Sequence, residues 1–104
     1  MDKRTQLKAL LDEDPKDSFL LFALAKEWEK YNSETAIKYY LQLKSLDPEY
    51  LALYFHLGQL YYEEKQIEKS RETLTAGLAV AKQQGDKKTE GELRELLLIV
   101  EMTD

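Results

Sequence analysis

Cysteine is absent from the sequence, so neither a disulfide nor a thiolate site can form, although nothing about the redox compartment follows. A single histidine, His56, excludes a metal cluster of the usual His/Cys kind. Four glycines and two prolines are too few for a turn-rich all-β chain. No stretch approaches the ~20 apolar residues that a membrane span needs, and no signal-peptide core follows the N-terminus. We therefore expect a near full-length cytoplasmic protein without metal or cofactor.

The charge balance is acidic, with a formal net charge of −5. Binding to a phosphate backbone needs clustered Lys and Arg, and the pair Lys87-Lys88 is too short for such a patch. Hydrophobic residues make up 43% of the chain and charged residues 34%, which is typical of a soluble globular protein. At 104 residues we expect one domain, with no nucleic acid and no membrane as partner.

The apolar residues recur at helical spacing throughout, and no segment alternates with period two. The pattern therefore predicts an all-α fold of about six helices. The expected helices are 1–12, 17–31, 34–45, 49–65, 67–84 and 87–102. Their breaks follow known end signals, such as proline after an acidic residue and glycine followed by an N-capping aspartate at Gly85-Asp86.

Each expected helix has an apolar face that should lie in the core. From the first helix to the last, these faces are Leu7, Leu10, Leu11; Leu21, Leu24, Ala25, Trp28; Ala36, Ile37, Tyr40, Leu43, Leu46; Tyr54, Leu57, Gly58, Tyr61; Ile67, Ser70, Leu74, Gly77, Leu78; and Leu93, Leu96, Leu97, Val100, widened by Leu98 and Ile99. A glycine among large residues indicates that two helices touch there. We expect Gly58 to be such a contact point.

The faces repeat along the chain at a nearly constant interval. The face of helix 17–31 recurs in helix 49–65, with Leu24 and Ala25 matching Leu57 and Gly58. By the same shift Tyr40 matches Leu74, to within one position. The repeating unit is therefore a helix-turn-helix of about 34 residues. Helix 1–12 is the second half of an earlier unit, because the proline after it, Pro15, matches Pro48.

This pattern resembles the tetratricopeptide repeat, in which a bulky residue, Leu, a small residue and an aromatic occupy the first helix, and small and aromatic residues followed by Pro occupy the second. The chain departs from it at Leu43, where the family prefers Ala, and at Lys82, which stands in place of Pro. The resemblance implies antiparallel helical hairpins stacked as a short right-handed α-solenoid. Its parts would be a half-repeat (1–14), two repeats (17–48 and 51–84) and a capping helix (87–102).

No catalytic motif accompanies these helices. His56 has no nucleophile tied to it by spacing, and it is more simply a polar residue of a surface or groove. Acidic runs such as Glu63-Glu64 and residues 12–14 are expected as solvated faces in a chain with 20 carboxylates. The tyrosine pairs 39–40 and 61–62 lack the basic neighbours that base stacking would need. We therefore expect no enzyme activity.

The resemblance implies a concave groove, lined by the first helix of each pair, that holds a peptide or protein segment of unknown identity. Once the core faces are set aside, the side chains expected to contact that segment are Phe19, Phe22, Lys26, Phe55, His56, Gln59 and Tyr62. Arg94 and Leu98 are possible contributors from the last helix. Lys26 alone cannot make the carboxylate clamp of some family members, so an apolar or aromatic ligand segment fits better. Two alternatives remain: a self-associating homodimer, and a last helix that folds over the groove.

Overall fold

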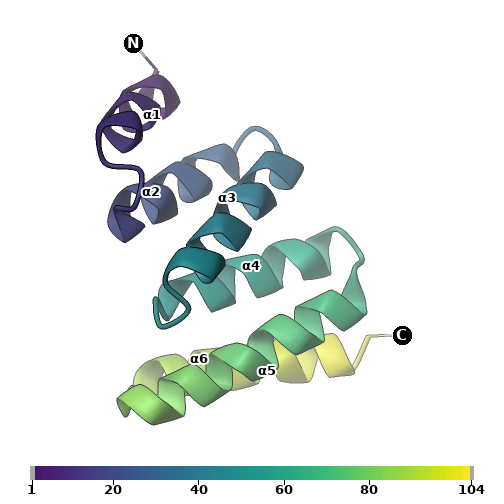
Figure 1. Cartoon of the computed structure of the whole chain (residues 1–104). Coiled ribbons are helices and arrows are strands. Elements are labelled where there is room, and N and C mark those ends of the chain that lie inside the picture. Colours follow the sequence, from purple (N-terminus) through teal and green to yellow (C-terminus); the bar gives the residue numbers. More distant parts are fainter. Residues whose placement is uncertain (1, 104) are drawn as a thin grey trace. The chain divides into compact units, whose positions relative to one another are not determined.

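The structure is a computed structural model, and it describes residues 2–103. The described residues form six α-helices and no strand (Figure 1), which confirms the all-α prediction. The helices are α1 (Lys3–Glu13), α2 (Ser18–Trp28), α3 (Ser33–Leu46), α4 (Ala52–Glu63), α5 (Ile67–Gln84) and α6 (Lys87–Glu101). The largest differences from the predicted ends are at α2 and α4. Residues 29–31 and 48–51 form turns instead, in which Tyr31 N–H donates to the Trp28 carbonyl at 2.9 Å and Tyr50 N–H to that of Asp47 at 3.0 Å.

Side-chain caps explain why four of the helices begin where they do. The side chains of Asp2, Asp17, Asn32 and Asp86 each accept a hydrogen bond from a backbone N–H two or three residues further on. Such a cap satisfies one of the N–H groups that have no partner within the helix. At the end of α5, Gly85 adopts a φ of 72°, a left-handed conformation that glycine takes without a steric penalty. The predicted roles of Gly85 and Asp86 are therefore confirmed.

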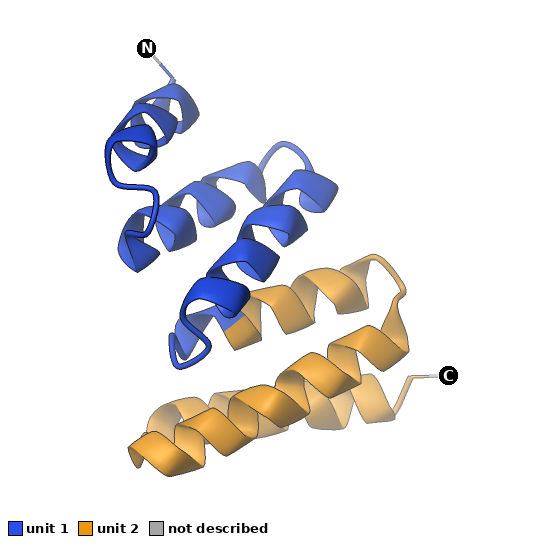
Figure 2. Ribbon diagram, in the orientation of Figure 1, with its two compact units in different colours: residues 1–53 blue, residues 54–104 orange. Residues whose placement is uncertain are grey.

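The chain divides into two compact units, residues 1–53 and 54–104, with the boundary inside the first turn of α4 (Figure 2). In unit 1, α1 packs on α2, and α2 packs on α3. Tyr40, Leu24 and Leu43 are fully buried in its core. They come from the predicted faces of α2 and α3, because residues three, four and seven apart lie on one side of a helix.

In unit 2, α5 lies against both α4 and α6. A Cβ atom added at Gly58 of α4 would lie 2.4 Å from Leu74 Cδ2 of α5. One added at Gly77 of α5 would lie 2.6 Å from Tyr54 Cβ and 3.3 Å from Leu93 Cδ1 of α6. Both distances to the nearest atom are below any real contact of a Cβ atom, so these two glycines let the helices approach closely. The predicted role of Gly58 is confirmed.

For several residues the predicted burial in the core is wrong or only partly right. Leu10 of α1 is 51% exposed, Leu46 of α3 is 39% exposed, and Leu98 and Ile99 of α6 are 58% and 50% exposed. Trp28 is half-buried. The helices α1 and α6 are the first and last of the chain, and their neighbours within each unit cover only part of a wide apolar stripe. Leu53 and Leu60 are buried although the predicted face of α4 omits them.

Candidate functional site

The seven residues predicted to bind a peptide fall into two sets, one in each unit. Phe19, Phe22 and Lys26 belong to α2 in unit 1, and the other four belong to α4 in unit 2. The first set lies beside α1, and Phe55 of the second set lies beside α6.

A pocket of about 320 Å³ lies between α1 and α2 in unit 1. Its lining comes from Lys3 and Leu7 of α1 and from Phe19, Phe22, Ala23, Lys26 and Glu27 of α2. Phe19 is 65% exposed, which is unusual for a phenylalanine. The pocket therefore offers an aromatic surface flanked by two lysines.

The Phe22 ring connects this pocket to the core of unit 1. It lies 5.3 Å from the Tyr50 ring and 6.0 Å from the Tyr40 ring, within the range of favourable tilted aromatic pairs. The Tyr40 hydroxyl donates to the Glu29 carboxylate, and burial together with this hydrogen bond raises the pKa of Tyr40 far above its ordinary value. Lys26 Nζ lies 5.7 Å from the centre of the Phe22 ring, where a cation is attracted to the π-face. Phe22 is therefore fixed in place, whereas the Phe19 side chain faces solvent.

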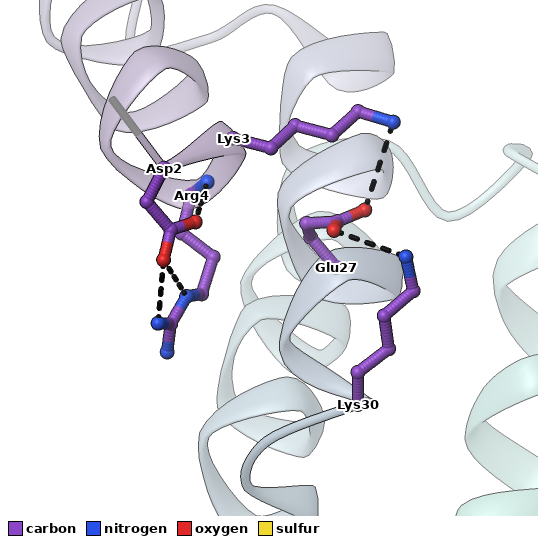
Figure 3. Close-up of polar contacts among 5 residues, drawn as sticks. All are labelled: Asp2, Lys3, Arg4, Glu27 and Lys30. Carbon is purple, nitrogen blue, oxygen red and sulfur yellow. Dashed lines mark hydrogen bonds and ion pairs between the residues drawn. The ribbon is translucent and has the colours of Figure 1, made fainter.

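One ionic contact, between Lys3 and Glu27, joins α1 to α2 at the edge of the same pocket (Figure 3). The Glu27 side chain is 12% exposed, and its carboxylate lies 3.1 Å from Lys30 Nζ and 3.8 Å from Lys3 Nζ. The Arg4 guanidinium donates to the Asp2 carboxylate and lies 3.7 Å from the centre of the Tyr31 ring. Hydrogen bonding to Arg4 also lowers the pKa of Asp2. The Lys3–Glu27 pair and the contacts of Arg4 with the Trp28 and Tyr31 rings join the first turn of α1 to α2 and to the turn that follows it.

In unit 2, a smaller pocket of about 260 Å³ lies between α4 and α6. Its lining is Phe55 of α4 with Glu92, Glu95, Leu96 and Ile99 of α6. Phe55 is half-buried, so α6 lies beside it without enclosing it. Unlike the unit 1 pocket, this one has carboxylates rather than lysines at its edge.

The other three predicted residues of α4 do not line that pocket. The His56 ring meets the Phe55 ring edge-on at 6.0 Å. Gln59 is exposed and donates from Nε2 to Glu63 Oε2 at 3.3 Å. The Tyr62 hydroxyl lies 3.1 Å from Thr103 Oγ1, which itself donates to the Ile99 carbonyl. Tyr62 thus joins α4 to the end of α6 and contributes to packing.

Prediction from the sequence missed the terminal helices as walls of both pockets. The repeat pattern places Lys3 and Leu7 in a half-repeat, and it predicts only Arg94 and Leu98 as contributors from α6, neither of which lines the pocket. Both helices carry apolar residues on more than one flank, and the sequence does not show which flank faces the neighbouring helix. Among residues 2–103, no group of His, Asp and Glu side chains is arranged to hold a metal ion.

Within the described part of the chain, no helix combines the length and the apolar character that crossing a membrane requires. No family model matches the sequence, and no curated protein matches it either.

Solved structures do match. A tetratricopeptide repeat domain protein from Salinibacter ruber is 32% identical in its crystal structure, with 85% of this chain and 99% of that chain covered and a TM-score of 0.80. Its solution structure gives 33% identity, coverage of 86% and 92%, and a TM-score of 0.82. A type III secretion translocator chaperone from Yersinia enterocolitica shares the fold at 15% identity, with 95% and 70% covered and a TM-score of 0.87. Together with the repeated helical hairpins, these likenesses show that the chain belongs to the tetratricopeptide repeat family.

Proposed function

We propose that the chain is a non-catalytic protein-interaction module that binds a peptide or protein segment through the aromatic side chains of α2 and α4. The observation that carries this proposal is Phe19, which is 65% exposed at the edge of the pocket of unit 1. Burying an exposed phenylalanine against a partner stabilises a complex by roughly 1.5–3 kcal/mol. Aromatic residues in a pocket are also typical anchors of protein interfaces.

The pocket of unit 1 fits a segment with an apolar or aromatic residue next to an acidic one. Phe19, Phe22 and Leu7 would receive the apolar side chain, and Lys26 lies beside them for the carboxylate. The pocket of unit 2, with Phe55 and Ile99, is a second contact surface of the same module. The Yersinia neighbour is described as a chaperone, which agrees with a protein as partner. We place the module in the cytoplasm and assign it a scaffold role.

The proposal is tested by selecting peptides from a displayed random library against the wild-type protein. Enriched peptides should bind in the micromolar range, and Phe19→Glu should weaken their binding about tenfold or more, because a carboxylate replaces the exposed ring beside the pocket. Phe55→Glu tests the second surface in the same way. Leu41→Glu is the matched control, since Leu41 is an exposed apolar residue of α3 outside both pockets.

Circular dichroism and thermal melting of each variant separate loss of binding from loss of fold. If no peptide is enriched, or if enriched peptides bind folded Phe19→Glu and Phe55→Glu as tightly as the wild type, these pockets are not the binding surface.

A further inference from the structure

The pocket of unit 2 combines apolar surface with two carboxylates. Its lining consists of Phe55 of α4 and of Glu92, Glu95, Leu96 and Ile99 of α6. The four residues of α6 are spaced at i, i+3, i+4 and i+7, so they form one stripe of this helix. Along the stripe the carboxylates come first and the apolar side chains follow. A segment that lies along α6 in this pocket therefore meets negative charge at one end and apolar surface at the other.

The two carboxylates have no partner within the part of the chain that the structure describes. Neither the Glu92 nor the Glu95 side chain forms an ion pair or a hydrogen bond there. Arg94 stands between them in the sequence but pairs with Glu90, with Nη2 2.7 Å from Oε2. The other wall, α4, has no lysine or arginine, and its His56 does not line the pocket. The helices that form the pocket thus leave its negative charge uncompensated.

The apolar part of the pocket is open to a partner. Ile99 is 50% exposed, and Phe55 and Leu96 are half-buried, so each of the three has uncovered surface. The pocket has a volume of about 260 Å³. Sites for drug-sized ligands measure about 300–1,000 Å³. The pocket therefore suits one anchoring side chain of a larger partner better than a whole small molecule.

From these observations we propose that the pocket of unit 2 selects a basic segment, in which an apolar residue stands next to a lysine or an arginine. The apolar side chain lies against Phe55 and Ile99, and the cationic group lies beside Glu92 and Glu95. The aliphatic stem of lysine or arginine also packs on apolar surface while its charged end stays in water. Opposite charges at an interface favour the correct partner and disfavour a segment of the wrong sign.

This inference rests on the proposed function, because it names the class of segment that one of its two surfaces binds. The pocket of unit 1, with Lys26 at its edge, suits an acidic segment instead. The two surfaces therefore recognise segments of opposite charge, and one kind of peptide does not serve both.

Selection from a displayed random peptide library tests the preference directly. The wild type and Phe55→Ala are screened in parallel, and peptides that the wild type alone enriches identify the pocket of unit 2. Alanine is used here because a glutamate at this position would itself attract a basic peptide. The identified peptides should carry more lysine and arginine beside an apolar residue than the unselected library does. If they carry no such excess, the proposal is overturned.

Fluorescence anisotropy of one such peptide then measures what the carboxylates contribute. Exposed ion pairs are individually weak, so Glu92→Gln/Glu95→Gln should weaken binding about three- to tenfold. Added salt should weaken binding to the wild type more than binding to this variant. The matched control is Glu72→Gln/Glu101→Gln, which removes two exposed carboxylates of unit 2 outside the pocket. Both pairs change the net charge equally, so the control reports any general attraction of a basic peptide to this acidic chain.

Two results of this measurement would overturn the proposal. They are an unchanged affinity for Glu92→Gln/Glu95→Gln, and an equal loss in the control pair. A peptide that needs Phe55 but not the two carboxylates would refute the charge preference alone and leave the second contact surface in place. If no enriched peptide needs Phe55, the second contact surface of the proposed function and its preference are both refuted.

Thermal melting of each variant separates these outcomes from loss of fold. Glu92 and Glu95 are exposed and unpaired within the described residues, so their replacement by glutamine should leave the melting curve unchanged. Phe55 is half-buried, and Phe55→Ala removes part of its packing. If this variant is unfolded at the temperature of the assay, Phe55→Leu replaces it, because leucine keeps an apolar side chain and lacks the ring.

Discussion

The repeats in units 1 and 2 bury corresponding positions, but residues of different size occupy them. Ala25 and Leu43 of unit 1 correspond in register to Gly58 and Gly77 of unit 2, and all four are buried. Unit 2 brings its helices together at glycines, where even a methyl group would overlap Leu74 or Tyr54. Unit 1 places larger residues at these positions. The periodicity therefore specifies which residues face the core, whereas residue volume specifies how closely the helices approach.

The polar groups in the two cores differ in the same way. In unit 2, the fully buried Ser70 donates from its hydroxyl to the Gly58 carbonyl at 2.7 Å. The corresponding residue of unit 1 is Ala36, which has no hydroxyl. Unit 1 instead has Tyr40, whose hydroxyl donates to Glu29, where unit 2 has Leu74. Each buried hydroxyl has its acceptor, so the two cores satisfy their polar groups by different routes.

The largest effect is expected where unit 2 has the least room. Gly58→Leu places a side chain where Leu74 already lies, and we expect overpacking to lower the free energy of unfolding by about 1–3 kcal/mol or more. Chemical denaturation followed by circular dichroism measures this change. Gly91→Leu is the matched control, because a Cβ atom there meets no atom within 4 Å. An unchanged midpoint for Gly58→Leu would contradict close contact between α4 and α5.

A smaller effect is expected at the polar contact of unit 1. Tyr40→Phe removes the hydrogen bond to Glu29, a half-buried residue, and should lower the free energy of unfolding at neutral pH by about 0.5–1.5 kcal/mol. The folded state raises the pKa of Tyr40 above 10.0, so the unfolded chain loses its proton first and stability falls as the pH rises through 10.0. The variant should therefore show a shallower loss of stability at alkaline pH. Denaturation at neutral pH and above pH 10.0 measures both effects, and equal alkaline slopes would contradict the role of Tyr40.

The fold was predictable because most of the evidence for it is local. Apolar spacing, the caps at Asp17, Asn32 and Asp86, and Gly85 define elements without knowledge of their neighbours. The repeat predicted the burial of Leu24, Tyr40 and Leu57, because each occupies a position that is apolar in both units.

The pockets were less predictable because they depend on how a terminal helix lies against its neighbour. The wide apolar stripe of α6 suggested that Leu98 and Ile99 were core, and only the packing within unit 2 shows which part of the stripe is covered. Similarly, the sequence gives no sign that the Tyr62 hydroxyl lies 3.1 Å from Thr103 Oγ1, an atom of a residue 41 positions later. Contacts between residues so far apart leave no periodic trace in the sequence.

The smallest expected effect concerns Gly91, and its sign distinguishes this glycine from the two inside unit 2. Gly91→Ala should raise the free energy of unfolding of the monomer by about 0.5–1 kcal/mol, because alanine is the better helix former and its methyl group meets open space. Gly58→Ala should lower it, because the same methyl group overlaps Leu74. Thermal melting of the two variants at low protein concentration measures the stability change of the monomer, without a contribution from association. If Gly91→Ala were destabilising under those conditions, Gly91 would be needed within the monomer itself, and the contrast with Gly58 would be lost.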